Sequence, residues 1–526
     1  AHRLRVQSPA PRQYGGPPQN GIFDQDSHNQ GLDNCMSNVP ASASFEQQLD
    51  ASHLTRPMGW LWFLSAGLIA LDGFDFFIIG VALPFIEQDF GLSASATGAI
   101  AGAALVGSLV GALTLGPLTD RIGRQRMLVI DVALFVLASA ATALAWDALS
   151  LIGFRFLVGV AIGADYPISV AYITENVPAR LRGRMVIGAF TFQAIGALFG
   201  ALTGLAILAL FQVIYPDSLI PTIHYAWRWM LGVGLGLAIA VALLRSQFLL
   251  ESPRYYIAQG DYEAASTAAS ILLEKPLTIT PASEPPPAAP LHYGALFSAP
   301  YWRRTLLASV PWFLQDIATY GIGIFTPVII ATLVFDQAPD FITQQFAAMQ
   351  GAAFVDLFLI AGFLFAILWV DRVGRIQLQV TGFIGMAVGL LLLALSSLPQ
   401  LSSRGSFVLV FLGFTVFNLL MNLGPNSTTF LLSGEVFPTQ IRASGAGFAA
   451  AIAKAGAVLG TVALPLWQRS LGTFSLLIAL AFVCLAAAGF TYGCRVETTG
   501  RSLDAIDEAT APEPTLSPAA NAPPAQ

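Results

Sequence analysis

The sequence predicts an all-α membrane protein of twelve transmembrane helices in two pseudo-symmetric six-helix halves. Three observations predict this fold: an apolar composition, twelve apolar runs long enough to cross a bilayer, and two loop motifs that recur six helices apart. Of the 526 residues, 55% are hydrophobic and only 11% are charged, whereas a soluble domain carries about 25% charged residues. The excess apolar surface must face lipid, so we expect the bilayer to be a partner of this chain.

Apolar runs of about 20 residues mark the helices. The predicted spans are 58–86, 94–116, 126–145, 149–173, 185–211, 226–249, 304–334, 345–369, 377–398, 404–432, 442–467 and 473–493. The resulting segments are a disordered N-terminal tail (1–56), an N-terminal half (57–249), a cytoplasmic middle loop (250–303), a C-terminal half (304–495) and a disordered C-terminal tail (496–526).

Arginine placement predicts the orientation. The loops after helices 2, 4, 8 and 10 are richer in arginine than the odd-numbered loops. Arginine-rich loops stay in the cytoplasm, so we expect both termini to be cytoplasmic. We expect no organelle-targeting segment, which favours the plasma membrane or a bacterial inner membrane.

Two loop motifs repeat at matched places. Residues 120–124 (Asp-Arg-Ile-Gly-Arg) after helix 2 return as residues 371–375 (Asp-Arg-Val-Gly-Arg) after helix 8. Residues 175–180, Glu-Asn-Val-Pro-Ala-Arg after helix 4, are echoed by residues 435–442 after helix 10, which also begin with Glu and end with Arg. Ordinary arginine anchoring would not place two different motifs six helices apart. Duplicated halves with a site at their interface are the architecture of a rocking transporter.

Together these motifs resemble the major facilitator superfamily over residues 58–495, and residues 251–254 (Glu-Ser-Pro-Arg) resemble its sugar-porter-like branch. The resemblance implies the major facilitator fold and charged gating residues that latch the halves in the outward-facing state. These gating residues are Asp120, Arg121, Arg124, Glu175, Arg180, Glu251, Arg254, Asp371, Arg372, Glu435 and Arg442.

Several charged side chains fall inside the predicted helices, where burying an ionised group is costly and a specific structural or functional role is expected. The acids are Asp72, Asp75, Asp131, Asp165, Asp316 and Asp356, and they outnumber two bases, Arg155 and Lys454. A pair such as Asp75 with Arg155 could be structural, but the whole set cannot. Buried unpaired carboxyls tend to take up protons, which favours proton-coupled symport. The sequence has no P-loop, nucleophile–base pair or metal cluster, so we expect neither an enzyme nor a metal or cofactor site.

Helix 7 carries a polar stripe, because Trp312, Asp316 and Tyr320 recur every four residues. Pro167 frees a carbonyl in helix 4, and Gly424-Pro425 breaks helix 10. Broken helices and convergent polar groups at mid-membrane mark a binding site. The structural alternative for the helix-7 stripe is an aromatic packing ridge.

These residues resemble the phosphate:proton symporter family in five helices. The matches are residues 165–167 (Asp-Tyr-Pro), Gln193, the helix-7 stripe, residues 424–426 (Gly-Pro-Asn) and residues 453–456 (Ala-Lys-Ala-Gly). The resemblance implies phosphate contacts from Tyr166, Gln193, Trp312, Asp316, Tyr320 and Asn426, with Lys454 beside them. It implies proton transfer by Asp72, Asp131 and Asp165, and Asp75 and Arg155 are further proton-coupling candidates. Two positions depart from the family: Ala164 stands where glycine is usual, and Asp131 where glutamate is usual.

The donor set agrees with phosphate. A site with Tyr, Trp, Gln and Asn donors, one carboxylate and no arginine would repel sulfate at Asp316, whereas dihydrogen phosphate can donate its own O–H there. We therefore predict proton-coupled uptake of inorganic phosphate by a monomer that binds no nucleic acid. The alternatives are a proton symporter of a small organic acid or sugar, and a nutrient sensor that does not transport.

Overall fold

The computed structural model describes residues 44–216, 218–248, 250–281, 292–299, 301–323, 326, 330, 340–398 and 403–501. All regular secondary structure in these residues is helical. Most of the two tails that we expect to be disordered, 1–43 and 502–526, lies outside the described residues, as does the Pro-rich part of the middle loop.

The N-terminal half consists of six long helices. They are α3 (Arg56–Phe90), α4 (Ala94–Ile122), α5 (Arg124–Ala143), α6 (Ala148–Asn176), α7 (Ala179–Ile214) and α8 (Leu219–Phe248). Their ends carry local signals: Thr55 caps the first turn of α3, and Gly91 ends α3 in the left-handed conformation with φ of 59°. Asp147 and Ser150 form a reciprocal capping box that starts α6.

The C-terminal half contains α11 (Trp302–Gly323), α13 (Phe341–Val373), α14 (Arg375–Ser396), α15 (Ser403–Leu423), α16 (Pro425–Glu435) and α17 (Arg442–Gly493). Gly472, with φ of 76°, divides α17 into two spans. The predicted break in helix 10 is confirmed, because Gly424 separates α15 from α16. The predicted end of helix 7, beyond Gly323, lies almost entirely outside the described residues.

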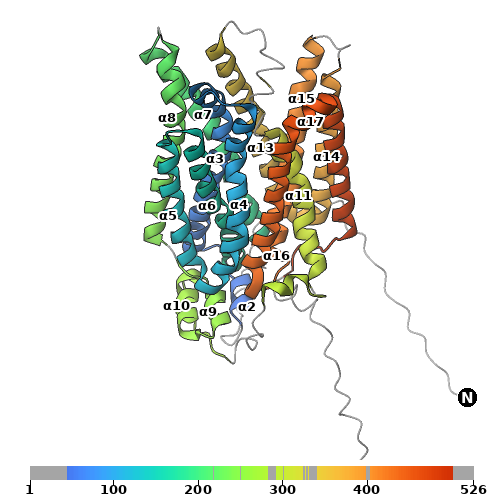
Figure 1. The fold of residues 1–526 in the computed structure, drawn as a ribbon. Coiled ribbons are helices and arrows are strands. Elements are labelled where there is room, and N and C mark those ends of the chain that lie inside the picture. Colours follow the sequence, from blue (N-terminus) through green and yellow to red (C-terminus); the bar gives the residue numbers. More distant parts are fainter. Residues whose placement is uncertain are drawn as a thin grey trace, which may run out of the picture. The chain divides into compact units, whose positions relative to one another are not determined.

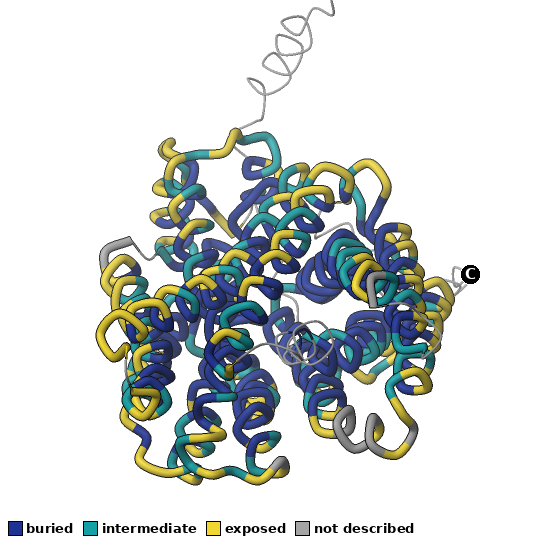
Figure 2. The backbone as a smooth tube through the Cα atoms, turned by 90° about the horizontal axis from the view of Figure 1, so that it is seen from above, coloured by how far each residue is buried: buried dark blue, intermediate teal, exposed yellow. Residues whose placement is uncertain are grey.

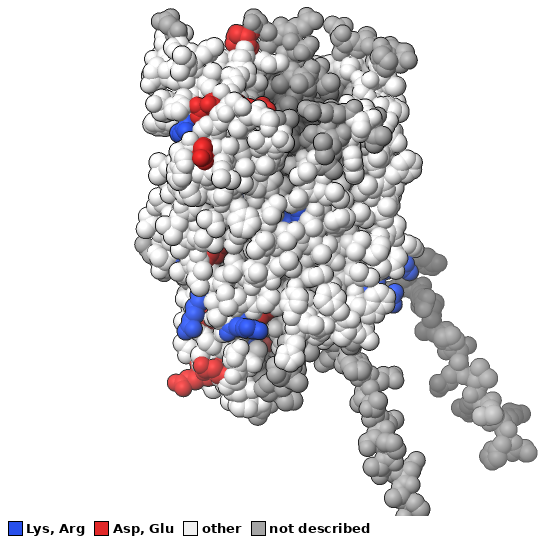
Figure 3. Space-filling view, viewed as in Figure 1, with Lys and Arg blue, Asp and Glu red and all other residues white. Residues whose placement is uncertain are grey.

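Eleven helices in the described part of the chain are long and apolar enough to cross a membrane, with α15 and α16 taken as one span. The polar helix α11 is not among them, and with it the set corresponds to the twelve predicted helices. Large apolar side chains lie on the outside of the bundle; Leu137, Leu149 and Phe482 are 70%, 77% and 66% exposed. Such a surface requires lipid. Figures 2 and 3 show the exposed outer faces and a broad belt with few charges. The chain is an integral, multi-pass membrane protein.

The two halves repeat the same packing. In the N-terminal half α3 packs on α7, and in the C-terminal half α11 packs on α17; the halves meet where α4 contacts α17 and α7 contacts α13 (Figure 1). Glycines bring these backbones close together. A Cβ atom at Gly73 would lie 2.0 Å from the carbonyl oxygen of Gln193, and one at Gly456 would lie 2.2 Å from that of Phe313.

Three further helices lie at one end of the bundle, the end that the arginine pattern predicts to be cytoplasmic (Figure 1, bottom). They are α2 (Phe45–Asp50), α9 (Pro253–Gln259) and α10 (Tyr262–Leu273). Phe45 and Leu49 are buried in a cluster with Leu272, and Asp50 Oδ1 accepts a hydrogen bond from the amide of Ala179 at 2.7 Å. The prediction of a disordered tail up to residue 56 is therefore wrong for residues 44–56, because two apolar side chains four apart bury one face of α2.

Candidate functional site

A small cavity lies between the two halves, near the middle of the long helices. Its lining residues are Phe77, Gln193, Ala194, Trp312, Asp316, Thr319, Tyr320, Leu359, Phe363, Met421, Asn422, Asn426, Phe430 and Lys454. Six of the seven predicted substrate residues belong to this lining; Tyr166 lies behind it. The cavity volume is about 30 Å³, room for roughly two to three water molecules.

The helix-7 stripe faces this cavity and meets a lysine from another helix. Lys454 Nζ, on α17, donates to Asp316 Oδ2 at 3.0 Å and to the Tyr320 hydroxyl at 2.9 Å. Lys454 and Asp316 are each 1% exposed. The pair cancels its own charge in a site that water barely reaches.

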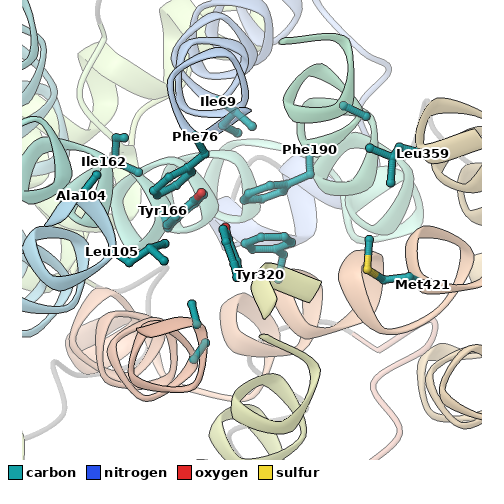
Figure 4. Packing of buried hydrophobic residues seen from close by; sticks show 14 of the residues in the cluster. Ile69, Phe76, Ala104, Leu105, Ile162, Tyr166, Phe190, Tyr320, Leu359 and Met421 are labelled. Carbon is teal, nitrogen blue, oxygen red and sulfur yellow. The ribbon is translucent and has the colours of Figure 1, made fainter. Parts of the chain in front are cut away.

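Aromatic rings surround the ammonium group. Lys454 Nζ lies 4.3 Å from the ring centroid of Tyr320, 5.3 Å from that of Tyr166 and 5.6 Å from that of Phe76. Cations are stabilised at such distances over ring faces. Figure 4 shows Phe76, Tyr166 and Tyr320 gathered in this region. The rings therefore help to keep a charged lysine inside the membrane.

Tyr166 connects the α6 backbone to the cavity through Gln193. The Gln193 side-chain amide donates to the Tyr166 hydroxyl at 2.9 Å. The ring of Phe430 lies 5.5 Å from that of Tyr166 and 4.7 Å from that of Trp312, centroid to centroid. Contacts between the two halves thus fix the walls of the cavity on both sides.

The break between α15 and α16 presents an amide whose orientation is fixed by two neighbours. Asn426 Oδ1 accepts from Gln315 Nε2 at 2.9 Å, and Asn426 Nδ2 donates to Asn422 Oδ1 at 2.7 Å. Because a side-chain amide carries two N–H groups, Asn426 keeps one for a ligand. Sequence reasoning missed Gln315 and Asn422. Their positions in the sequence could have indicated them, because Gln315 is next to Asp316 and Asn422 lies four residues before Asn426.

The buried acids of the N-terminal half fall into two groups. Arg155 Nη1 donates to both carboxyl oxygens of Asp75, at 2.8 and 2.7 Å. This geometry is that of the structural ion pair that the sequence left open. In contrast, neither carboxyl oxygen of Asp72 or Asp131 has a hydrogen-bond partner among the described residues, although these side chains are 0% and 1% exposed.

Asp165 lies between these two cases. Its Oδ1 accepts from the Ser169 hydroxyl at 2.9 Å and lies 3.8 Å from Arg245 Nη2, while Oδ2 has no partner in the described part of the chain. Sequence reasoning missed Arg245 as a further buried base, because it stands near the end of a predicted helix, where arginine usually reaches the interface.

Many of the predicted gating residues meet across the halves at the predicted cytoplasmic end. Asp120 Oδ2, on α4, accepts from the amide and hydroxyl of Ser444 on α17, at 2.8 and 2.6 Å. Arg442 of the C-terminal half lies 3.3 Å from Glu175 of the N-terminal half. Arg184 of α7 lies 3.0 Å from Asp371 of α13. These contacts hold the halves together at this end.

Within each half the same ion pairs recur. Arg124 Nη2 lies 2.9 Å from Glu175 in one half, and Arg375 Nη2 lies 3.3 Å from Glu435 in the other. The remaining gating candidates lie nearby at the same end of the bundle. Arg180 donates to the Ser52 carbonyl at 2.6 Å, Arg254 pairs with Glu46, the Arg121 carbonyl accepts from Tyr255 at 3.0 Å, and the Arg372 side chain is exposed.

A second glutamate repeats the role of Glu251. Glu251 accepts from the amides of Arg124 and Gln125, each at 3.1 Å, and Glu497 accepts from those of Arg375 and Ile376, each at 3.2 Å. Burial raises the pKa of Glu251. Burial also acts to raise the pKa of Glu497, but hydrogen bonds from Thr499 and backbone amides outweigh it and lower that pKa. The expectation of disorder from residue 496 is therefore wrong for residues 496–501.

Comparison with known proteins agrees with this architecture. The sugar (and other) transporter family matches residues 62–510. The probable inorganic phosphate transporter 1-6 of Arabidopsis thaliana is 28% identical over 492 residues, 84% of this chain and 92% of that protein. The putative inorganic phosphate transporter 1-13 of Oryza sativa subsp. japonica is 30% identical over 414 residues, 74% of this chain and 79% of that protein.

The solved structure of the proton:xylose symporter XylE of E. coli, a major facilitator superfamily protein, has the same fold. It matches with a TM-score of 0.70 and 19% identity over 87% of this chain and 100% of that one. The match at residues 62–510 covers most of the chain, from α3 to beyond the end of α17. This chain is a transporter of the major facilitator superfamily and belongs to its sugar (and other) transporter family.

Proposed function

We propose that the protein takes up inorganic phosphate together with protons by alternating access. One observation carries this proposal: the cavity between the halves holds a neutral Asp316–Lys454 pair, surrounded by hydrogen-bond donors. The relatives that bear the name of inorganic phosphate transporters match over most of the chain and support the same substrate.

The donors suit a singly charged oxyanion that still carries protons. The Trp312 indole, the free N–H of Asn426 and a further N–H of Lys454 can each donate to a phosphate oxygen. Asp316 Oδ1 can accept the O–H of dihydrogen phosphate. An anion without an O–H would bring its charge against this carboxylate with no hydrogen bond in return. The cavity volume of about 30 Å³ is too small for phosphate, so the halves must separate slightly when phosphate enters.

We assign proton transfer to the buried carboxyl groups that have no cation in direct contact. A buried carboxyl without a cation or a donor is more stable in its neutral form, because an uncompensated buried charge is costly. Asp72 and Asp131 meet this condition, and Asp165 meets it in part through its free Oδ2. We assign Asp75 and Arg155 to holding α3 against α6, because Arg155 Nη1 binds both carboxyl oxygens of Asp75 and the two charges neutralise each other.

The latch at the predicted cytoplasmic end supplies the conformational step. Asp120, Glu175 and Asp371 each contact the opposite half there. Transport requires these contacts to break so that the cavity opens to the cytoplasm, where the higher pH removes the protons and phosphate leaves. In this proposal both termini face the cytoplasm, the membrane is a plasma or bacterial inner membrane, and one chain suffices for the cycle.

Uptake of radiolabelled phosphate into proteoliposomes tests the substrate. We expect uptake that arsenate inhibits and that sulfate and xylose leave unchanged. The Asp316→Asn variant should lose most of this uptake, whereas Leu357→Ala, on the lipid-facing side of α13, should retain it. If folded, inserted protein transports a sugar or an organic acid and ignores phosphate, the alternative substrate class replaces phosphate.

A further inference from the structure

The sixth of the acids inside the predicted helices, Asp356 on α13, has no role in the mechanism above. It lies in a second, smaller cavity that also spans the two halves. The lining residues are Phe77, Val81, Ala197, Ala201, Gly323, Thr326, Ala352 and Asp356. Phe77 lines both this pocket and the central cavity, so the two are neighbours along the interface.

The pocket lies on the side of the central cavity away from the predicted cytoplasmic end. Helix α7 begins at the predicted cytoplasmic end and reaches Gln193 before Ala197 and Ala201. Helix α13 ends there, and its Asp356 precedes Leu359 of the central cavity. Both helices therefore place the second pocket one to two turns further out. The pocket therefore lies between the central cavity and the end of the bundle that the arginine pattern predicts to be external.

Among the described residues that line this pocket, none is a cation that could compensate the charge of Asp356. The side chain is 7% exposed, and the described residues supply no ion pair or hydrogen bond to its carboxyl group. Apart from Asp356 itself, the lining is apolar except for Thr326, which lies just beyond the end of α11. The Thr326 hydroxyl donates to the Ile322 carbonyl at 3.2 Å and keeps its acceptor capacity. The charged pair nearby, Asp316 with Lys454, lines the central cavity instead.

The two acids in the middle of α3 lie outside this pocket. Asp75 on α3 binds Arg155, and Asp72 does not line the pocket. The cavity volume is about 10 Å³, room for about one water molecule. A single water molecule in this cavity could exchange a proton with Asp356, and no cation among the described lining residues would compete for the carboxyl group.

We propose that Asp356 is an external proton site on the substrate path, and that it must be neutral for phosphate to pass into the central cavity. This inference rests on the proposed function, because it assigns a charge gate to the same anion path. An ionised Asp356 would place a fixed negative charge in a nearly dry passage, and a second anion would be repelled there. Protonation from outside removes that charge and leaves a carboxyl that can hydrogen-bond the passing anion.

The test compares the external pH dependence of the KM for phosphate in wild type and Asp356→Asn. Asparagine is neutral at every pH, so the variant lacks the proposed gate. The protonation of phosphate itself affects both proteins equally and cancels in the ratio of their KM values. We expect the ratio of wild-type to variant KM to be near one at acid pH and to rise about tenfold at alkaline pH. Asp356→Glu should retain the wild-type profile.

A thiol-labelling experiment covers the case in which Asp356→Asn fails to fold. In a background without the three native cysteines, Asp356→Cys should react with a membrane-impermeant thiol reagent applied outside, and phosphate should protect it. Leu357→Cys, 50% exposed on the neighbouring lipid-facing position, should not react. A flat KM ratio in active protein, or no protected labelling, would overturn the role of Asp356 and leave phosphate transport standing. Absence of phosphate uptake by wild type would overturn both.

Discussion

The buried pair of Asp316 and Lys454 provides a quantitative prediction. The two charges lie 3.0 Å apart with side chains about 2% exposed. At an effective dielectric constant of about 20, that separation corresponds to an attraction of about 5.5 kcal/mol. Much of this attraction is offset by the desolvation of both groups. Removing one partner leaves the other charge buried and unpaired, which costs about 3–5 kcal/mol.

The perturbation is a double-mutant cycle of Lys454→Met, Asp316→Asn and the double variant. Each single variant should be markedly less stable than wild type, and the double variant should be more stable than either single one. We expect a coupling free energy of about 3 kcal/mol. The control pair is Arg184 with Asp371, which has the same 3.0 Å separation but side chains 46% and 21% exposed. Its coupling should stay below about 1 kcal/mol.

Thermal unfolding of purified protein in detergent reads the stability, and phosphate uptake reads the function. The double variant should recover stability without recovering uptake, because asparagine cannot replace the carboxylate that accepts the phosphate O–H. If the stability losses of the two single variants simply add in the double variant, the ion pair between Asp316 and Lys454 does not contribute to stability, and this reasoning is refuted. Wild-type uptake by Asp316→Asn would refute the assigned contact with substrate.

Three further predictions concern other parts of the molecule. Asp131→Asn should abolish the stimulation of phosphate uptake by an inward proton gradient while counterflow exchange of phosphate persists; gradient-driven uptake at the wild-type rate would exclude Asp131 as a proton carrier. Gly73→Ala should lower thermal stability and uptake, because its Cβ would lie 2.0 Å from the Gln193 carbonyl, whereas Gly67→Ala meets only a side chain at 3.6 Å and should resemble wild type. Glu497 has a lowered pKa, so its stabilising contribution should be complete above the ordinary value of 4.5 and be lost as pH falls through the folded-state value; an unfolding difference between wild type and Glu497→Gln that grows on acidification would contradict this sign.

The twelve helices and the two halves were predictable because hydropathy and loop arginines are local properties of the sequence. The spacing of Trp312, Asp316 and Tyr320 predicted one face of α11, and all three side chains line the cavity. The Lys454–Asp316 contact was not predictable from spacing, because its two residues are 138 positions apart and meet only after α11 packs on α17.

Other features depended on tertiary context that single-sequence patterns do not carry. In the sequence, Gln315 is next to Asp316 but does not share the spacing of four that links Trp312, Asp316 and Tyr320. Its hydrogen bond to Asn426 forms only because α16 packs beside α11 in the folded protein. The order of α2 and of Glu497 comes from burial and hydrogen bonds supplied by distant helices. The polar, Pro-rich composition around these two segments led to the prediction of disorder, because composition does not show contacts with distant helices.

In the proposed function, phosphate and protons cross the membrane together through the site between the halves. The most direct measurement follows radiolabelled phosphate and luminal pH in the same proteoliposomes, with a trapped pH-sensitive dye and no imposed pH gradient. We predict that an inward phosphate gradient alone acidifies the lumen beyond what protein-free vesicles show, and that Asp316→Asn abolishes both signals. Phosphate entry without luminal acidification would contradict the account.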